Sequence, residues 1–212
     1  LVVPAAPGTA TDTVARFASE RLGRELGGAV AVENKVGANG IIGIDFVAKA
    51  PADGYTLLAS PSPVYVNKAL YAKVPYEPIA DFVPLAKAAS AYLVLVVPAA
   101  SPYQTLKDLV DFMRANPGKL SYASGGTGSV THMAPALLVS MAGGQAVHVP
   151  YKGSDGATTD TISGQVAFSF PAVAGALPHI QSGRLRALAV YGARRSSALP
   201  NVPALTELGF PI

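Results

Sequence analysis

Hydrophobic positions along this chain recur with two different periods. Short β-branched runs such as Leu1–Val3 have the character of buried strands, and they alternate with stretches whose apolar residues return every three or four positions. The first such stretch, Asp12–Leu26, is predicted to be a helix that begins at the side-chain oxygens of Thr11 and Asp12 and ends at Gly27-Gly28. Its predicted buried face carries Val14, Phe17, Ala18 and Leu22. The chain therefore begins with strand, loop and helix.

The same alternation continues through residue 59. We predict strands at Val30–Val32 and Tyr55–Ala59, a loop at Gly37–Gly43 and a helix at Ile44–Ala50, with a turn at Asp53-Gly54. Strands and helices in alternation form mainly parallel sheets with helices on both faces. The fold class predicted for this region is α/β.

A second α/β lobe is predicted after the proline-punctuated stretch 75–84. Its first strand, Leu93–Val97, runs into Leu95–Ala100, which repeats the hexapeptide found at Leu1–Ala6. Thr105 with Asp108 has the spacing of a capping box, so the apolar positions that follow predict a helix, which ends at residues 116–118. The other predicted strands are Leu120–Ala123, Val147–Val149, Val166–Phe170 and Leu185–Val190, and the other helices carry Met133 to Met141, Ala157–Ser163 and Leu177–Ser182.

The tail is predicted to be a loop from Gly192 to Pro203, followed by one helical turn around Leu205. We predict a first lobe made of residues 1–92 and 193–212, and a second lobe made of residues 93–192. Because the chain starts on an apolar run and stops at Ile212 without a closing strand, we expect a mature or trimmed chain whose first lobe lacks a piece.

Composition narrows the class of protein. Half of the residues are hydrophobic and 14% are charged, which argues for an ordered globular protein. The net charge of +3 is scattered without the basic cluster that nucleic acid or anionic lipid needs, so no nucleic-acid partner is expected. The absence of cysteine excludes disulfides, thiolate catalysis and Cys-ligated metals. No apolar run approaches the ~18 residues of a membrane span, and no signal-peptide pattern is seen.

Two loops at the predicted carboxyl ends of strands carry the candidate chemistry, because open α/β sheets bind ligands there and helix amino termini offer N–H groups to anions. In the first loop, small residues let a ligand approach the backbone and two hydroxyls can donate to a carboxylate. A plain strand-to-helix turn is the alternative. The candidate residues are Ala6, Pro7, Gly8, Thr9 and Thr11.

The second loop is denser in glycine and hydroxyl groups, which favours an anion-binding nest over a simple turn. Its candidate residues are Ser124, Gly126, Thr127, Gly128, Ser129 and His132. After the next strand, Tyr151 could hydrogen-bond an anion and Lys152 could attract one, or they could be a half-buried tyrosine beside a solvated lysine. Ser60 and Ser62 form a further polar rim or only a connection.

Other chemistries lack their motifs. The second loop lacks the last glycine of G-x-G-x-x-G, and no glycine run precedes Lys-Ser or Lys-Thr, so no cofactor is expected. The elbow G-x-S-x-G is absent, and a hydrolase using Ser129 and His132, one helical turn apart, is the less favoured alternative because no third partner is apparent. His132, His148 and His179 are isolated from one another and from acidic clusters, which predicts no metal site.

Several motifs occur in order along nearly the whole chain. They are Val2-Val3-Pro4 with Ala10-Thr11-Asp12, Val32-Glu33-Asn34-Lys35 with Gly37-Ala38-Asn39-Gly40, Ala52–Leu57, Asn116–Leu120, Gly126–Ser129 with His132, Val149–Gly153, and Ala176–Ile180 before Leu185–Val190. No single motif is decisive, yet the ordered set resembles the tripartite tricarboxylate transporter receptors, also called Bug proteins.

The resemblance implies a type II periplasmic-binding-protein fold, with two α/β lobes and the ligand in the cleft between them. It also implies a periplasmic receptor, not an enzyme, that captures a di- or tricarboxylate or a related organic acid without a cofactor. Delivery of the ligand to the membrane components of a tripartite tricarboxylate transporter is expected, and a monomer is expected. A carboxylate-sensing protein that presents its ligand to a signalling partner is the alternative.

Two departures from the family bear on specificity. Ala5 stands where the family often has an aromatic residue, and Pro171 follows Phe170 where the family often has an acidic residue. Losing that acid removes a partner for a ligand ammonium group. A carboxylate without an α-amino group is therefore expected. Pro171 and Ala172 are also counted among the candidate ligand contacts.

Overall fold

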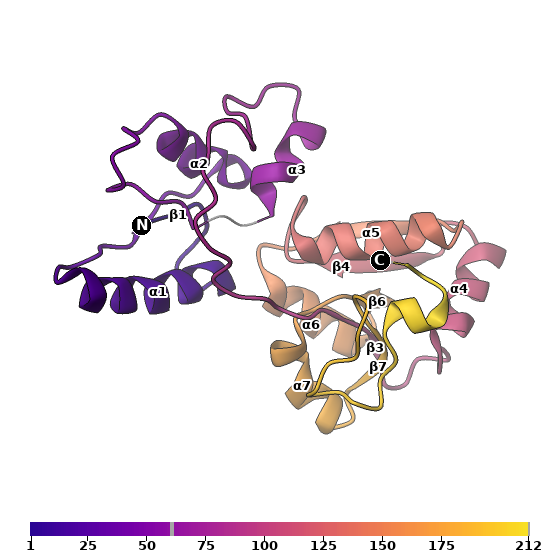
Figure 1. Ribbon diagram of the computed structural model, residues 1–212. Helices are drawn as coiled ribbons and strands as arrows, with labels where there is room; N and C mark the ends of the chain where they lie inside the picture. The colour runs from indigo at the N-terminus through magenta and orange to yellow at the C-terminus, as the bar shows by residue number, and fades with distance from the viewer. Residues whose placement is uncertain (60–61, 212) are drawn as a thin grey trace. The chain divides into compact units, whose positions relative to one another are not determined.

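The chain forms two compact units, Leu1–Ser90 and Ala91–Ile212, and the computed structural model describes residues 1–59 and 62–211 (Figure 1). The first unit is built on a small parallel sheet. β1 (Val2–Val3) pairs in parallel with β2 (Glu33–Asn34), and Leu58 forms a parallel bridge to Val2. Because the three segments run in one direction, the helix that follows each of them starts at the same edge of the sheet.

The helices of the first unit follow its strands in turn. They are α1 (Ala10–Leu26), α2 (Ile41–Ala48) with the preceding 3₁₀ turn η1 (Ala38–Gly40), and α3 (Pro63–Leu70). Ile44 of α2 and Val64 of α3 pack with Tyr76 in a buried cluster. A cap at Gly27, in the left-handed conformation with φ 67°, ends α1 as the sequence predicts.

Three predicted boundaries in the first unit are wrong. The strand predicted at Val30–Val32 lies at Glu33–Asn34, because the N–H groups of Glu33 and Lys35 are the ones that donate to β1 and its flanking residue. The strand predicted at Tyr55–Ala59 is reduced to the bridge at Leu58. The second helix begins at Ile41, because the left-handed backbone from Gly37 to Gly40 turns the chain into it earlier than predicted.

The predicted buried face of α1 is wrong at Phe17, which is 59% exposed, whereas Val14, Ala18 and Leu22 are half-buried. The fully buried residues of α1 are Asp12, Ala15 and Ser19. These small or hydrogen-bonded side chains let the helix lie close to β1. Thr9 is the N-cap residue, where Thr11 and Asp12 were predicted, because its hydroxyl accepts the Asp12 N–H.

The second unit is a five-stranded sheet of order β5-β4-β6-β3-β7. Its strands are β3 (Val94–Pro98), β4 (Leu120–Ser124), β5 (Ala146–Pro150), β6 (Phe168–Ser169) and β7 (Leu185–Val190). β4 pairs in parallel with β5 and β6, whereas β3 pairs antiparallel with β6 and β7. The sheet is therefore mainly parallel, as predicted, with β3 as its antiparallel strand.

Helices cover both faces of this sheet (Figure 1). α4 (Leu106–Ala115) and α5 (Val130–Met141) lie on one face, and α6 (Ser154–Ser163) and α7 (Val173–Gln181) on the other. Alternate residues of β3 serve the two faces: Leu95 and Val97 pack with α4 and α5, and Val94 and Val96 pack with α7. Phe168 and Phe170 are the largest fully buried side chains of this core.

The tail packs on the second unit. Val190 bridges Ala204 in parallel, Leu205 at the start of η2 (Leu205–Leu208) is buried in the core, and Arg195 forms an ion pair with Glu207. The helical turn predicted around Leu205 is therefore present. The assignment of residues 193–212 to the first lobe stays a prediction.

Candidate ligand-binding site

Three parallel strands of the second unit end at one edge, and each leads into a helix. β4 leads into α5, β5 into α6 and β6 into α7, so the amino termini of helices with 12, 10 and 9 residues meet at this edge. Helix amino termini present N–H groups that no carbonyl of the helix can satisfy, and they carry partial positive charge. This edge is therefore suited to an anion.

The loop between β4 and α5 is held in shape by side chains of its own neighbourhood. The Gly125 N–H donates to Thr131 Oγ1 at 2.9 Å, and the Gly126 N–H donates to Ser124 Oγ at 3.1 Å. The Gly128 N–H donates to Nδ1 of His132 at 3.1 Å. Gly126 and Gly128 have φ values of 135° and 78°, which residues with a Cβ atom rarely adopt. The shape of the loop therefore depends on glycine at these two positions.

The predicted hydroxyls of this loop mostly close the loop itself. Ser129 Oγ donates to the Gly126 carbonyl at 2.7 Å and lies 2.9 Å from Thr131 Oγ1. Within the described residues, the N–H groups of Thr127, Val130 and Thr131 make no hydrogen bond. The groups left to meet a ligand in this loop are therefore backbone donors more than the predicted side chains.

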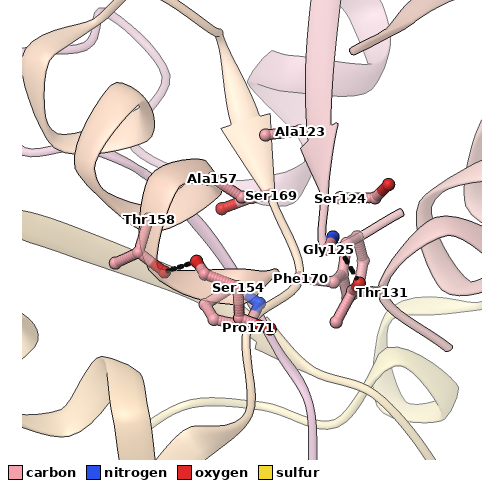
Figure 2. A pocket seen from close by; sticks show the side chains of 10 residues that line it. All are labelled: Ala123, Ser124, Gly125, Thr131, Ser154, Ala157, Thr158, Ser169, Phe170 and Pro171. Carbon is pink, nitrogen blue, oxygen red and sulfur yellow. Dashed lines mark hydrogen bonds between the residues drawn. The ribbon is translucent and has the colours of Figure 1, made fainter. Parts of the chain in front are cut away.

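A small hollow, partly open to solvent, lies at this edge, and its cavity volume of about 10 Å³ has room for about one water molecule (Figure 2). Side chains from the ends of β4 and β6 and from α5 and α6 line it, and none of them carries a charge. The lining residues are Ala123, Ser124, Gly125, Thr131, Ser154, Ala157, Thr158, Ser169, Phe170 and Pro171. Of the predicted residues, Ser124 and Pro171 line this pocket. The hydroxyls of Thr131, Ser154, Thr158 and Ser169 also line it and were not predicted from the sequence.

The missed hydroxyls share a signal in the sequence. Ser154 and Thr158 are one turn apart at the start of α6, so they lie on the same face of that helix. Thr158 Oγ1 donates to the Ser154 carbonyl at 2.9 Å, as Figure 2 shows. Ser169 is buried and bonds with the hydroxyl of Thr161 at 2.9 Å. A search for hydroxyls in the first two turns of each helix that follows a strand would therefore have found Thr131, Ser154 and Thr158, whereas Ser169 lies within β6.

Tyr151 and Lys152 do not join the pocket lining. The Tyr151 hydroxyl donates to Oδ2 of Asp160 at 2.5 Å, and this hydrogen bond to a carboxylate is the main reason that the pKa of Tyr151 is raised. Lys152 is exposed. Ala172 is the N-cap residue of α7 with an extended backbone, next to Pro171.

The first-unit loop is organised around a buried carboxylate. Oδ2 of Asp12 accepts the Gly8 N–H at 2.9 Å and Nε of Arg16 at 2.9 Å, and Oδ1 accepts Nδ2 of Asn34 at 2.8 Å. Arg16, the Gly8 N–H and Asn34 together hold the pKa of Asp12 far below its usual range. The Thr9 hydroxyl donates to the Ala6 carbonyl at 2.9 Å, so it also closes its own loop.

The remaining predicted residues of the first unit differ in their exposure to solvent and in their hydrogen bonds. Ala6, Pro7 and Gly8 are exposed, and Thr11 is half-buried in the first turn of α1. Ser62 precedes α3 and makes no side-chain cap hydrogen bond, and Ser60 lies outside the described residues. Which of these residues contact a ligand stays a prediction.

The prediction that the histidines are isolated is wrong for two of them. The rings of His132 and His148 stack with centroids 3.9 Å apart, and Nε2 of His148 lies 2.7 Å from Ser124 Oγ. His148 is the cross-strand partner of Tyr122 in the β4–β5 register, which brings it beside the loop. Tyr122 and His148 each stand two positions before the end of their strands. Aligning the two parallel strands at their ends would therefore have predicted that these two residues are neighbours.

Burial and mutual repulsion favour the neutral form of this histidine pair. Burial, followed by the positive charge of His132, lowers the pKa of His148 to about 4. Burial also lowers the pKa of His132. Both rings are therefore uncharged at neutral pH.

Ser129 and His132, the two residues that a hydrolase would use, are not hydrogen-bonded to each other. Ser129 Oγ is bonded to Gly126 and Thr131, and Nδ1 of His132 is taken by the Gly128 N–H, so neither group is turned to the other. Within residues 1–59 and 62–211, no three metal-ligating side chains gather at one place. No helix in that part of the chain is long and apolar enough to cross a membrane.

The chain is similar to proteins of one family along nearly its whole length. Residues 14–211 match the family described as tripartite tricarboxylate transporter family receptor. A protein of a Pseudomonas species, encoded in the tcbD-tcbE intergenic region, is 43% identical over 97% of this chain and 61% of its own length. Protein BugT of Bordetella pertussis is 39% identical over 100% of this chain and 65% of its own length. The chain thus spans somewhat less than two thirds of these relatives.

Solved structures agree in fold along the chain. A protein of R. palustris solved with adipate is 33% identical with a TM-score of 0.84, covering 99% of this chain and 71% of the other. MatC from Rhodopseudomonas palustris with bound malate is 29% identical with a TM-score of 0.81, covering 100% of this chain and 74% of the other. Both ligands are small dicarboxylates.

Proposed function

The chain belongs to the tripartite tricarboxylate transporter receptor family, whose members are solute-binding proteins and not enzymes, and we propose that it serves to bind a small dicarboxylate and release it unchanged. The observation that carries the proposal is the pocket at the edge of the second-unit sheet, which is lined by hydroxyls and helix amino termini and by no charged side chain. The adipate and malate of the two similar structures supply the class of ligand.

The physical basis of binding is a set of oriented dipoles. A carboxylate at the amino termini of α5 and α6 would accept hydrogen bonds from backbone N–H groups such as those of Thr127 and Val130 and from hydroxyls such as that of Ser154. Each helix end contributes about half a positive charge. Such donors suit a carboxylate of any chain length, so the far end of the ligand is left to other contacts.

We propose that the loop from Ala6 to Thr11 in the first unit also contacts the ligand. Its exposed small residues and the amino terminus of the 17-residue helix α1 support this role. A periplasmic location and delivery to the membrane components of a tripartite tricarboxylate transporter are proposed from family membership.

The ligand is proposed to lack an α-amino group. Pro171 follows Phe170 at the pocket, and no acidic side chain lines the pocket to pair with an ammonium group. A buried charge without a partner is costly, so an amino acid would bind worse than the matching diacid.

The proposal is tested by thermal unfolding with adipate, malate, aspartate and glutamate, followed by recovery of the ligand. Ligand at 100 times its dissociation constant should add about 2.7 kcal/mol of stability. We expect adipate or malate to raise the midpoint, aspartate and glutamate to raise it little, and the ligand to be recovered unchanged.

A matched pair of glycine variants locates the effect. Gly126→Ala strains the ligand loop at φ 135°, and Gly118→Ala strains a turn at φ 72° at the opposite end of β4. We expect both variants to unfold at lower temperature, and only Gly126→Ala to lose the ligand response. A ligand response that survives Gly126→Ala unchanged, or stronger binding of glutamate than of the diacids, would contradict the proposal.

A further inference from the structure

His132 and His148 each hold a different atom of the ligand loop. His148 on β5 bonds through Nε2 to Ser124 Oγ at 2.7 Å, and the same hydroxyl accepts the Gly126 N–H at 3.1 Å. His132 on α5 accepts the Gly128 N–H through Nδ1 at 3.1 Å. The two glycines with the unusual φ values are thus the two that the histidines anchor, one directly and one through a serine.

The hydrogen bonds define the protonation state that they need. Nδ1 of His132 accepts from a backbone N–H, so it carries no proton and the ring is neutral. Ser124 Oγ already accepts from Gly126, so its own hydrogen can donate to Nε2 of His148. A proton added to His132 Nδ1 would face the Gly128 N–H donor, and a proton added to His148 Nε2 would force the Ser124 hydroxyl to rotate.

The surroundings of the pair offer no compensating negative charge. The two rings stack at 3.9 Å, and the ring of Tyr122, from β4, lies 5.1 Å from His148 and 6.3 Å from His132. Behind Tyr122 lies Phe168 of β6 at 5.6 Å, which does not titrate. Among the described residues, no carboxylate bonds to either ring, so the titratable groups facing each histidine are the other histidine and a tyrosine.

We propose, resting on the carboxylate-binding function proposed above, that His132 and His148 are positioning residues: as a neutral stacked pair they hold the loop from Ser124 to Ser129 in its binding conformation, and protonation of the pair releases it. Neither ring needs to touch the ligand. His132, predicted from the sequence as a ligand contact, instead acts through Gly128.

The direction of the pH dependence follows from linkage. Ligand binds the conformation that requires neutral rings, so binding and protonation oppose each other. The dissociation constant should then rise as the pH falls, by about tenfold per pH unit for each proton that binding excludes. The lowered pKa values of both histidines place this loss in mildly to strongly acidic solution and leave binding near neutrality unaffected.

Amide variants of the two histidines separate the effect of their hydrogen bonds on the loop from the effect of their side-chain volume. His132→Asn puts an amide oxygen close to where Nδ1 accepts from Gly128, and His148→Gln lets an amide reach Ser124 Oγ. Neither amide titrates. His132→Leu and His148→Leu keep the bulk and lose the hydrogen bonds. His179→Gln is the matched control, since it removes a histidine on α7 that is not bonded to the loop.

The first readout needs no ligand. The backbone amide signals of Gly126 and Gly128 are followed by NMR against pH together with the imidazole signals. We expect these two amides to titrate with the imidazoles in the unmodified protein and in His179→Gln, and to lose that response in the His132→Asn/His148→Gln double variant. Amides that stay constant while the imidazoles protonate would overturn the proposal.

The second readout is adipate binding between pH 7 and pH 4. At pH 7 we expect the double amide variant to bind within a few-fold of the unmodified protein, and the leucine variants to bind at least about tenfold more weakly, since each leaves a loop donor unpaired. Toward pH 4 the unmodified protein should lose about tenfold more affinity than the double amide variant. Protonation of adipate itself affects both equally.

The outcomes are distinguishable. Equal pH profiles for the unmodified protein and the double variant would contradict the role of the histidine pair. If adipate and malate fail to bind at any pH, the proposed function fails, while the glycine amide titrations still decide whether the histidines control the loop. Should the double variant not fold, each single amide variant is expected to flatten part of the profile.

Discussion

At the scale of single residues, the candidate site consists of backbone donors kept in place by side chains that are themselves satisfied. Thr131, Ser129 and Ser124 use their hydroxyls to fix the loop, and Asp12 does the same for the first-unit loop through Gly8. Ser124 and Ser129 were predicted from the sequence, because glycine and hydroxyl density after a strand is a local signal, whereas the roles of Thr131 and Asp12 in fixing the loops were not. The sequence could not predict which hydroxyls would form hydrogen bonds within the loop, because these bonds depend on distances between α5, β4 and β5.

Asp12 provides a test at this scale. Asp12→Asn should lower the thermal unfolding midpoint at pH 7, because Arg16, Gly8 and Asn34 stabilise the carboxylate. The folded-state pKa of Asp12 lies below its ordinary value of 3.8, so this stabilisation is present above pH 3.8 and is lost as the pH falls toward the folded-state value. The difference between the two proteins should therefore shrink below about pH 4.

The control is Asp53→Asn, which makes the same change of charge on an exposed turn where, among the described residues, the carboxylate accepts only the Tyr55 N–H. It should alter the midpoint much less at pH 7. A deficit of Asp12→Asn that stays constant from pH 7 to pH 3 would mean that the carboxylate charge is not what holds the loop.

At the scale of elements, features contained in a few neighbouring residues were easier to predict than pairings between distant segments. The Thr105–Asp108 capping box is present, with both reciprocal hydrogen bonds, because its four residues contain the whole interaction. The short strands of the first unit are set by partners more than thirty positions away, as in the pairing of Val2 with Glu33. A shift of three residues in β2 changes no local propensity, so only the parallel register could reveal it.

The capping box predicts a measurable local cost. Thr105→Ala should destabilise α4 by about 1 kcal/mol, because the Asp108 N–H loses its partner at the start of the helix. Hydrogen exchange of the α4 amides measures this directly. Lys107→Ala, which removes only an exposed ion pair with Asp111, should cost much less than Thr105→Ala. Equal exchange rates in the two variants would show that the box contributes nothing.

At the scale of the whole molecule, the chain is two units joined by a long exposed segment. Residues 83–92 have neither helix nor strand and are exposed, and each unit has its own buried core. The repeat of the hexapeptide Leu1–Ala6 at Leu95–Ala100 indicated the start of a second α/β unit. It could not indicate that the first copy forms a parallel strand and the second an antiparallel one, because strand direction is decided by the neighbours in the sheet.

Limited proteolysis tests this division. Trypsin should cut first after Lys87, the basic residue of the exposed segment, and leave a fragment that begins at Ala88 and contains the whole second-unit sheet. Lys87→Gln should slow that first cut several-fold, whereas Lys119→Gln should not. A first cut at Arg114 or Arg186, which lie within α4 and β7, would contradict the two-unit organisation.

The absence of charged side chains from the pocket lining has a consequence for the medium in which the protein works. A binding site made of lysine or arginine loses attraction as dissolved salt screens its field over about 10 Å at 0.1 M. Hydrogen bonds from peptide N–H groups and hydroxyls act at contact distance, and the partial charge of a helix end is only about half a unit. The protein should therefore lose less affinity on addition of salt than a binding site built on lysine or arginine would lose.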